Sequence, residues 1–145
     1  MFHGTIVDGK KGPGIFWEKE LGSMNSTNYN EVVLSEIEKF FYENRGEGYI
    51  FMQDNAPSHR SQETMINLRL RQIPYVKFPP YSPDLNLIEH VWNWMKNWIQ
   101  DHYWQARYNV AKIPLQELRR IILAAWEAVP DSYIQELYNS WWRRC

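Results

Sequence analysis

The sequence predicts a mixed α/β fold in one domain that spans residues 1–145. Short segments rich in β-branched and aromatic residues alternate with longer segments whose apolar residues recur at helical spacing. Hydrophobic residues make up 44% of the chain and aromatic residues 16%, a composition typical of a packed globular protein. The expected order of elements is β-β-α-β-α-β-α-α-α, without an internal repeat or a low-complexity linker.

The first two strands are predicted over residues 2–7 and 14–18, where β-branched and aromatic residues are frequent. Turn signals lie between them at 8–9 and at 12–14, and they predict a hairpin with a loop longer than two residues. Apolar residues at helical spacing then predict a helix over 25–44.

The middle of the chain predicts two short strands with a helix between them. YIFMQ at 49–53 is brief enough for a buried strand, and a proline soon after it prevents the sheet from continuing. Ser58 or Ser61 can cap a helix that runs to about residue 72. The second strand is predicted over 75–78 and leads into a proline-broken loop.

Three helices are predicted in the last part of the chain, over residues 87–99, 114–129 and 131–145. In the first of them the apolar stripe consists of Ile88, Val91, Trp92, Met95, Trp98 and Ile99. In the second, one face carries Leu115, Leu118, Ile122, Ala125 and Trp126. We interpret these residues, including the tryptophans, as core.

Charge and cysteine content restrict the classes of partner. Sixteen basic and seventeen acidic residues give a net charge of −1, so any DNA contact must come from a local basic patch. No apolar run approaches the roughly 20 residues needed to cross a bilayer, so no membrane partner is expected. Cys145 is the only cysteine, which excludes an intramolecular disulfide and favours an intracellular, reducing compartment.

Two acidic residues occupy positions suited to a catalytic site. Asp54 follows a predicted buried strand, and sites in open α/β sheets gather at the carboxyl ends of strands. Glu89 lies in the first turn of a predicted helix, at the border of its packed face. Carboxylates brought together from such positions can bind hard divalent cations, which favour in-line phosphoryl displacement.

Each acid also has a purely structural explanation. Asp54 can form an Asx turn with the residues before Pro57. Asn86 and Glu89 fit a capping box, with Asn86 as the cap and Glu89 three residues later. The histidines do not have the spacing of a zinc site.

The sequence around both acidic residues resembles that of a known family. QDNAPSH at 53–59 and PPYSPDLNLIEHVWNWMK at 79–96 are similar to the second and third acidic motifs of mariner-type transposases of the DDE superfamily. Thirty-four residues separate Asp54 from Glu89, the spacing typical of family members whose third acid is Glu. The flanking segments resemble the family as well, so the resemblance covers essentially the whole chain.

The resemblance implies a ribonuclease H-like fold, a mixed sheet flanked by helices, lacking the first, central strand in this chain. It implies cleavage of DNA at transposon ends and strand transfer to target DNA, dependent on Mg²⁺ or Mn²⁺. Carried over to this sequence, Asp54 and Glu89 are the catalytic residues and metal ligands. Asn55, His59 and Asn86 are residues associated with the motifs.

The sequence differs from the family pattern in ways that affect the expected activity. The family's first catalytic Asp lies on a strand upstream of the hairpin, whereas only Met1 precedes the hairpin here. Asp8 is expected to be a turn residue and not a replacement. We therefore expect this chain to be catalytically impaired, with two unpaired strand edges where the first strand would lie. Leu87 stands where the family often has Pro, a difference of little consequence.

An alternative function is a non-catalytic transposase remnant that binds DNA or protein. The near-neutral charge weakens the stand-alone DNA-binding version, because phosphate contacts supply most non-specific affinity. The candidate DNA contacts are Arg60, Lys96, Arg143 and Arg144. The expected partners are transposon ends, target DNA, and a second copy or a full-length transposase, with a nuclear location if the host is eukaryotic.

Overall fold

The computed structural model describes residues 1–18, 22–79, 82, 85–103, 113–141 and 143. Strands and helices follow one another in the predicted order, which confirms the α/β class. Contacts divide the chain into two compact units: unit 1 is Met1–Thr5 with Gly12–Ser82, and unit 2 is Ile6–Lys11 with Pro83–Cys145. The single domain over 1–145 stays a prediction. None of the helices in the described ranges is long and apolar enough to cross a membrane.

The hairpin at the start of the chain consists of β1 (Phe2–Val7) and β2 (Lys10–Phe16), joined by Asp8 and Gly9 alone. These two residues have φ angles of 48° and 72°, the pair of positive values found in a type I′ turn. The predicted longer loop is therefore wrong. Asp-Gly tolerates both positive angles, so the chain reverses within two residues and β2 begins earlier than expected.

The predicted helix over 25–44 is present as one continuous helical path with a wider turn inside it. It consists of α1 (Ser26–Asn28), the π-helical turn η2 (Tyr29–Val33) and α2 (Leu34–Glu43). The Asn25 side chain caps its start by accepting a hydrogen bond of 2.8 Å from a backbone N–H in the first turn.

The two short strands of unit 1 are parallel neighbours. β3 (Phe51–Met52) pairs with β4 (Tyr75–Val76) in the register Phe51 to Tyr75 and Met52 to Val76. Both strands are shorter than predicted. In the described part of the chain, β1–β2 and β3–β4 are two separate two-stranded sheets.

The segment after β3 forms two helices where one was predicted. They are α3 (Pro57–Arg60) and α4 (Gln62–Leu70), separated by Ser61 in an extended conformation with φ −60° and ψ 150°. Of the two predicted caps, Ser61 is the one used for α4, because its hydroxyl accepts the Thr64 N–H at 3.1 Å.

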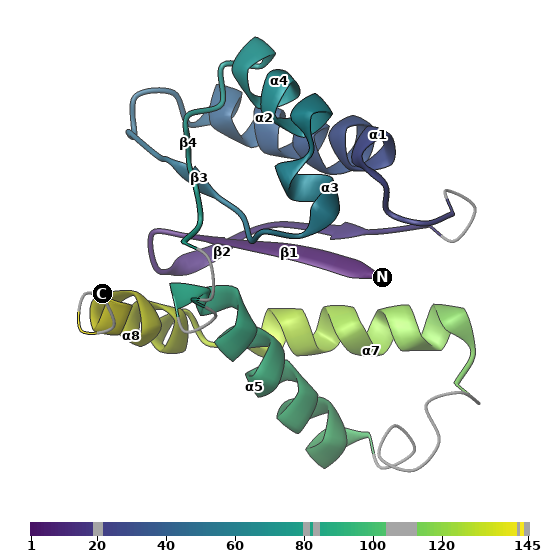
Figure 1. Ribbon diagram of the computed structural model, residues 1–145. Helices are drawn as coiled ribbons and strands as arrows, with labels where there is room; N and C mark the ends of the chain where they lie inside the picture. The colour runs from purple at the N-terminus through teal and green to yellow at the C-terminus, as the bar shows by residue number, and fades with distance from the viewer. Residues whose placement is uncertain (19–21, 80–81, 83–84, 104–112, 142, 144–145) are drawn as a thin grey trace. The chain divides into compact units, whose positions relative to one another are not determined.

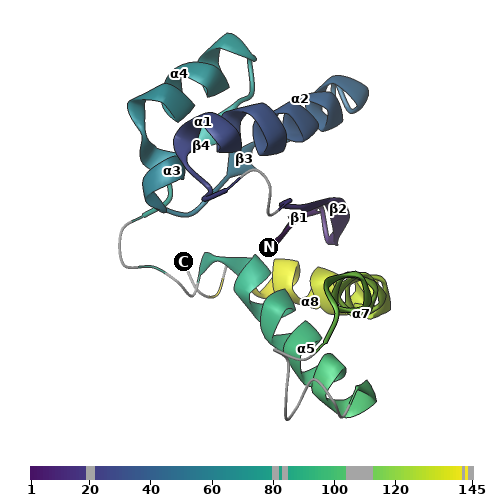
Figure 2. The ribbon, with the colours of Figure 1, turned by 90° about the vertical axis from the view of Figure 1, so that its right-hand side faces the viewer.

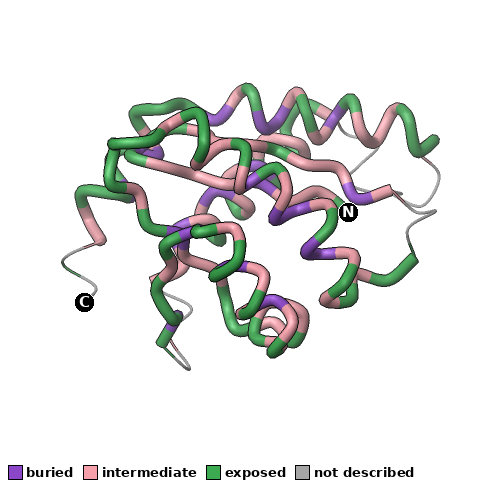
Figure 3. Tube along the Cα trace, turned by 90° about the horizontal axis from the view of Figure 1, so that it is seen from above, coloured by how far each residue is buried: buried purple, intermediate pink, exposed green. Residues whose placement is uncertain are grey.

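The core of unit 1 lies where the helical path formed by α1, η2 and α2 meets β3 and the end of α4. Figure 1 shows α1, α2, α3 and α4 gathered beside β3 and β4. In Figure 3, buried positions recur at intervals along the helices with exposed positions between them, as expected for helices with one packed face. The core residues are Tyr29, Val33, Leu34, Ile37, Phe51, Leu68 and Ile73.

Unit 2 consists mainly of three helices, α5 (Leu87–His102), α7 (Leu115–Ala128) and α8 (Asp131–Trp141), all three as predicted. Figures 1 and 2 show α5 running obliquely past α7. The buried residues of these helices are Leu87, Val91, Met95, Ile121, Ala125, Trp126, Ile134 and Leu137.

One predicted core position of α7 is wrong. Leu115, in the first turn of α7, is 56% exposed, and Ile121 is buried instead. The end of α7 is capped from the hairpin tip: Lys11 Nζ donates hydrogen bonds of 2.8 Å to the carbonyls of Glu127 and Val129. A cation at this end also suits the negative end of the helix dipole.

Candidate metal-binding site

Asp54 lies directly after β3, and its two carboxylate oxygens have different surroundings. Oδ1 accepts the Ala56 N–H at 2.9 Å and lies 2.6 Å from His59 Nδ1. The predicted Asx turn is therefore confirmed. Oδ2 has no hydrogen-bond partner among the described residues. Because the turn uses one oxygen only, the structural role and a ligand role do not exclude each other.

The charge on Asp54 is stabilised by these contacts. The hydrogen bond from His59 lowers the pKa of the Asp54 carboxyl; the Ala56 N–H and the nearby histidines act in the same direction, while burial opposes them. The Asp54 side chain remains 46% exposed, so an ion can reach it from solvent.

His59 is held in place by residues from other elements. Its ring centroid lies 4.4 Å from that of Tyr29, and its carbonyl accepts a hydrogen bond of 2.9 Å from Gln53 Nε2. Gln53 Oε1 in turn accepts the Tyr29 hydroxyl at 2.6 Å. Tyr29, Gln53, Asp54 and His59 thus form a connected cluster, which we call the β3-end cluster.

His3 of β1 borders this cluster. Its ring lies edge-on to Tyr29, with the ring centroids 6.3 Å apart. Burial, and after it the charge of His59, lowers the pKa of His3 to about 4, while the charge of Asp54 acts in the opposite direction. Burial, followed by the charge of Asp54, raises the pKa of Tyr29. Both residues are therefore neutral near pH 7.

Sequence reasoning missed three members of this neighbourhood. Gln53 stands beside Asp54 in the motif at 53–59, so the motif itself was a signal for it. Tyr29 has the helical spacing of an ordinary core residue, and no local pattern distinguishes it. His3 precedes Asp54 by 51 positions, and only the fold brings the two into electrostatic range.

Asn55 connects the ends of the two parallel strands. Its Nδ2 donates to the carbonyl of Phe78 at 3.2 Å and to that of Pro79 at 3.4 Å. These bonds attach the chain that leaves β4 to the loop that leaves β3. Asn55 therefore has a structural role beside Asp54.

Glu89 lies in the first turn of α5, in unit 2, and it is exposed. Among the described residues its carboxylate has no hydrogen-bond or ion-pair partner. The predicted capping box is wrong: Asn86 is the cap residue but makes no side-chain cap bond. Its backbone carbonyl instead accepts the Glu89 N–H at 3.1 Å, so that N–H needs no side-chain acceptor.

The start of α5 is held from α8. Trp141 Nε1 donates to the carbonyl of Leu85 at 3.0 Å, and the Tyr133 hydroxyl donates to that of His90 at 3.4 Å. These bonds lie on both sides of Glu89 in the sequence. They fix the backbone from which the Glu89 side chain projects.

The structure brings Asp54, Asn55 and His59 together in unit 1, whereas Asn86 and Glu89 belong to unit 2. Within the part of the chain that the structure describes, no group of three or more His, Cys, Asp or Glu residues is placed to hold a metal ion. The carboxylate oxygens of Asp54 and of Glu89 that have no partner among the described residues each have the chemistry of a ligand for a hard divalent cation, which prefers carboxylate oxygens. The candidate ligands are therefore carboxylates, without sulfur or imidazole donors.

The candidate DNA contacts do not share one element. Arg60 is the exposed last residue of α3, Lys96 is exposed on α5, and Arg143 follows α8. Arg144 lies outside the described residues. Their role in binding DNA stays a prediction.

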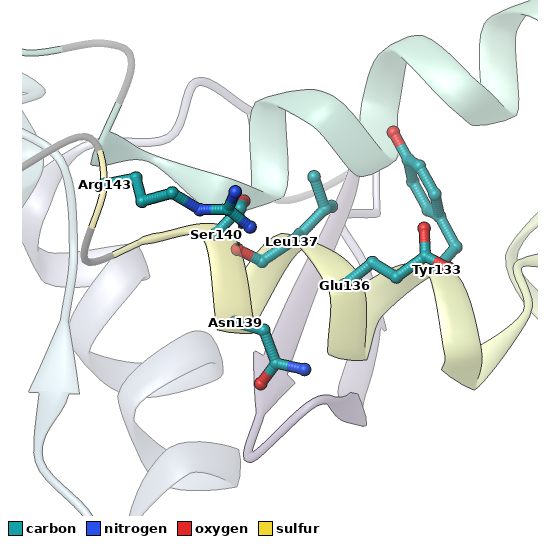
Figure 4. Close-up of a pocket in the computed structure, with 6 residues that line it drawn as sticks. All are labelled: Tyr133, Glu136, Leu137, Asn139, Ser140 and Arg143. Carbon is teal, nitrogen blue, oxygen red and sulfur yellow. Dashed lines mark hydrogen bonds between the residues drawn. The ribbon is translucent and has the colours of Figure 1, made fainter.

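A pocket of about 480 Å³ lies along α8. Figure 4 shows its lining, which comes from α8 and from Arg143 just beyond it. Its residues are Tyr133, Glu136, Leu137, Asn139, Ser140 and Arg143. Neither Asp54 nor Glu89 lines it, so it is not the predicted metal site.

Comparison with known proteins assigns the class. Residues 9–110 match the DDE superfamily endonuclease family, and the chain belongs to this family. It is 29% identical over 145 residues to the Tcb1 transposase of Caenorhabditis briggsae, covering 49% of that protein. It is 33% identical over 117 residues to the Tc3 transposase of Caenorhabditis elegans, covering 81% of this chain and 34% of that protein. The chain thus spans half or less of the length of these relatives.

Comparison with solved structures shows the fold of this chain. The Mos1 transposase catalytic domain with Raltegravir and Mn has a TM-score of 0.67 and 19% identity, over 84% of this chain and 60% of that one. The crystal structure of the Mos1 mariner catalytic domain has the same TM-score at 18% identity. This likeness confirms the predicted ribonuclease H-like fold, and the family match confirms the resemblance to mariner-type transposases. Neither assigns roles to Asp54 and Glu89.

Proposed function

We propose that this chain is the catalytic-core segment of a transposase that cuts and joins DNA strands, with Asp54 and Glu89 as ligands of Mg²⁺ or Mn²⁺. The observation that supports it most directly is the carboxylate of Asp54 at the carboxyl end of β3. One of its oxygens is held by two hydrogen bonds, and the other has no partner in the described part of the chain. Divalent cations bound there would stabilise charge on the attacking and leaving oxygens of a phosphodiester.

Different residues of the chain have different roles in the proposed binding of the cation. Asp54, whose pKa is lowered by the hydrogen bond from His59, is ionised at neutral pH and supplies a negative oxygen ligand. Glu89 supplies a second carboxylate from the first turn of α5. Asn55 keeps the loop of Asp54 attached to the chain after β4. Membership of the family supports DNA as the substrate. Pairing with a second transposase chain is part of the proposal.

Binding of Mn²⁺ to the 145-residue chain, measured by titration calorimetry, tests the proposal. Asp54→Asn should weaken binding more than about tenfold, since a ligand is lost and even outer partners of ligands contribute tenfold or more. Asn can still accept the hydrogen bonds that Asp54 Oδ1 accepts, so the turn should survive the change. Glu89→Gln should weaken binding too, because it removes the second proposed carboxylate ligand.

The matched control is Asp8→Asn, which removes the same charge at the hairpin turn. Asn is favoured at the positive φ of 48° that Asp8 adopts, so the turn should remain. Affinity close to that of the unchanged chain is expected for this control. If Asp54→Asn binds Mn²⁺ as tightly as Asp8→Asn, Asp54 is not a ligand and the proposed site is wrong.

A further inference from the structure

The two oxygens of Asp54 are differentiated by their contacts. Oδ1 carries both hydrogen bonds, from Ala56 N–H and from His59 Nδ1, whereas Oδ2 carries none among the described residues. A carboxylate fixed through one oxygen cannot rotate freely about its last side-chain bond. The remaining oxygen therefore points in one direction and can bind a cation through a single oxygen.

His59 is built into the fold more firmly than the acid it contacts. Its side chain is 12% exposed, against 46% for Asp54. Tyr29, which is fully buried, covers the ring of His59 at 4.4 Å between centroids. Gln53 holds the backbone of His59 and is itself held by the Tyr29 hydroxyl. The histidine is thus a fixed support behind an acid that faces solvent.

The direction of the hydrogen bond follows from the chemistry of its partners. An ionised carboxylate only accepts hydrogen bonds, so Nδ1 of His59 carries the proton in this contact. The separation of 2.6 Å is short, as expected when the acceptor is charged. The donor at Nδ1 is the side-chain contact that fixes Oδ1 of Asp54, beside the backbone contact from the Ala56 N–H.

We propose that His59 is a positioning residue for the metal site: by donating from Nδ1 to Oδ1 of Asp54, it sets Oδ2 as the oxygen that binds the cation. This inference rests on the proposed function and adds to it a residue that does not touch the cation. It also gives a reason for the hydrogen bond from Tyr29 to Gln53. The Gln53 side chain holds the backbone of His59, the positioning residue, and not Asp54, the proposed ligand.

Three substitutions of His59 separate positioning from packing. Asn places an amide N–H where Nδ1 was, whereas Gln places it farther along the side chain; both lose the ring that packs on Tyr29. Mn²⁺ affinity should fall about tenfold or more in His59→Ala and in His59→Gln, and His59→Asn should restore most of it. Thermal unfolding should be similar for the Asn and Gln variants, since they lose the same ring contact.

A second measurement needs no cation. Long-range ¹H–¹⁵N NMR of the unchanged chain should show a proton on Nδ1 of His59. A neutral His59 with its proton on Nε2 alone would overturn the inference, because the hydrogen bond to Asp54 could not then form. This result applies whatever the affinity of the chain for Mn²⁺.

The outcomes distinguish the inference from the function on which it rests. Equal Mn²⁺ affinity in the Asn and Gln variants of His59, with weak binding by Asp54→Asn, would reject the positioning role and leave the proposed site intact. Undiminished binding by Asp54→Asn would reject the proposed site itself. Restoration by Asn but not by Gln, together with the Nδ1 proton, would support both.

Discussion

Replacing Trp126 with alanine is expected to lower the free energy of unfolding of unit 2 by about 3–5 kcal/mol. Trp126 is 4% exposed on α7, and its ring centroid lies 5.8 Å from that of Trp92 on α5. Its loss removes a large apolar surface from the contact between the two helices and leaves a cavity. Amide hydrogen exchange of α5, α7 and α8 measures the change, because it reports the opening of these helices separately from unit 1.

Leu123→Ala is the matched control for this substitution. Leu123 lies on the same helix and is 45% exposed, so its truncation should change the free energy of unfolding by only about 0.5 kcal/mol. Equal acceleration of exchange in the two variants would mean that α7 does not bury the face described here. The result matters for the site, because the same packing holds the helix that carries Glu89.

Acidification from about pH 7 to about pH 4 is expected to destabilise unit 1 by up to about 3 kcal/mol through His3. The pKa of His3 is lowered by burial from 6.5 to about 4 in the folded chain. Between these values the unfolded chain binds the proton and the folded chain does not. The stability is therefore complete above about pH 6.5 and falls as the pH decreases toward 4. Urea unfolding followed by circular dichroism at a series of pH values measures the loss.

His3→Gln should flatten this dependence, because Gln does not titrate. Asp54 does not produce the same effect in this window. The hydrogen bond from His59 lowers the pKa of Asp54 in the folded chain, so the stability that Asp54 contributes is lost only as the pH falls below the ordinary range of an aspartate carboxyl. An unchanged slope between pH 6.5 and 4 in His3→Gln would show that His3 is not the buried neutral histidine described here.

Local patterns predicted most of the fold. The helix over 25–44, a cap at one of Ser58 and Ser61, and the three C-terminal helices depend on spacing and capping within a few residues, and all are present. The errors also have local causes. Asp8-Gly9 forms a turn that needs no further loop residues. Ser61 adopts an extended conformation and divides one predicted helix into two.

The site was predictable only in part. The motif around Asp54 identified the acid and His59, but it did not predict how its two oxygens divide their contacts. His59 is held in place through Gln53, which accepts a hydrogen bond from Tyr29, 24 positions earlier in the sequence. Only the packed fold brings these two residues together. At Glu89 the sequence favoured a capping box, which the backbone bond from Glu89 to Asn86 replaces. Contacts between distant segments leave no periodic signal, so they must be read from the structure.

Oδ2 of Asp54, which has no hydrogen-bond partner among the described residues, is the atom at which we expect a divalent cation to bind. Crystals of the chain grown with Mn²⁺ and measured at the manganese absorption edge test this claim most directly. We predict an anomalous peak within coordination distance of Asp54 Oδ2, with His59 Nδ1 still on Oδ1. A peak elsewhere, with Oδ2 of Asp54 facing only solvent, would contradict the claim.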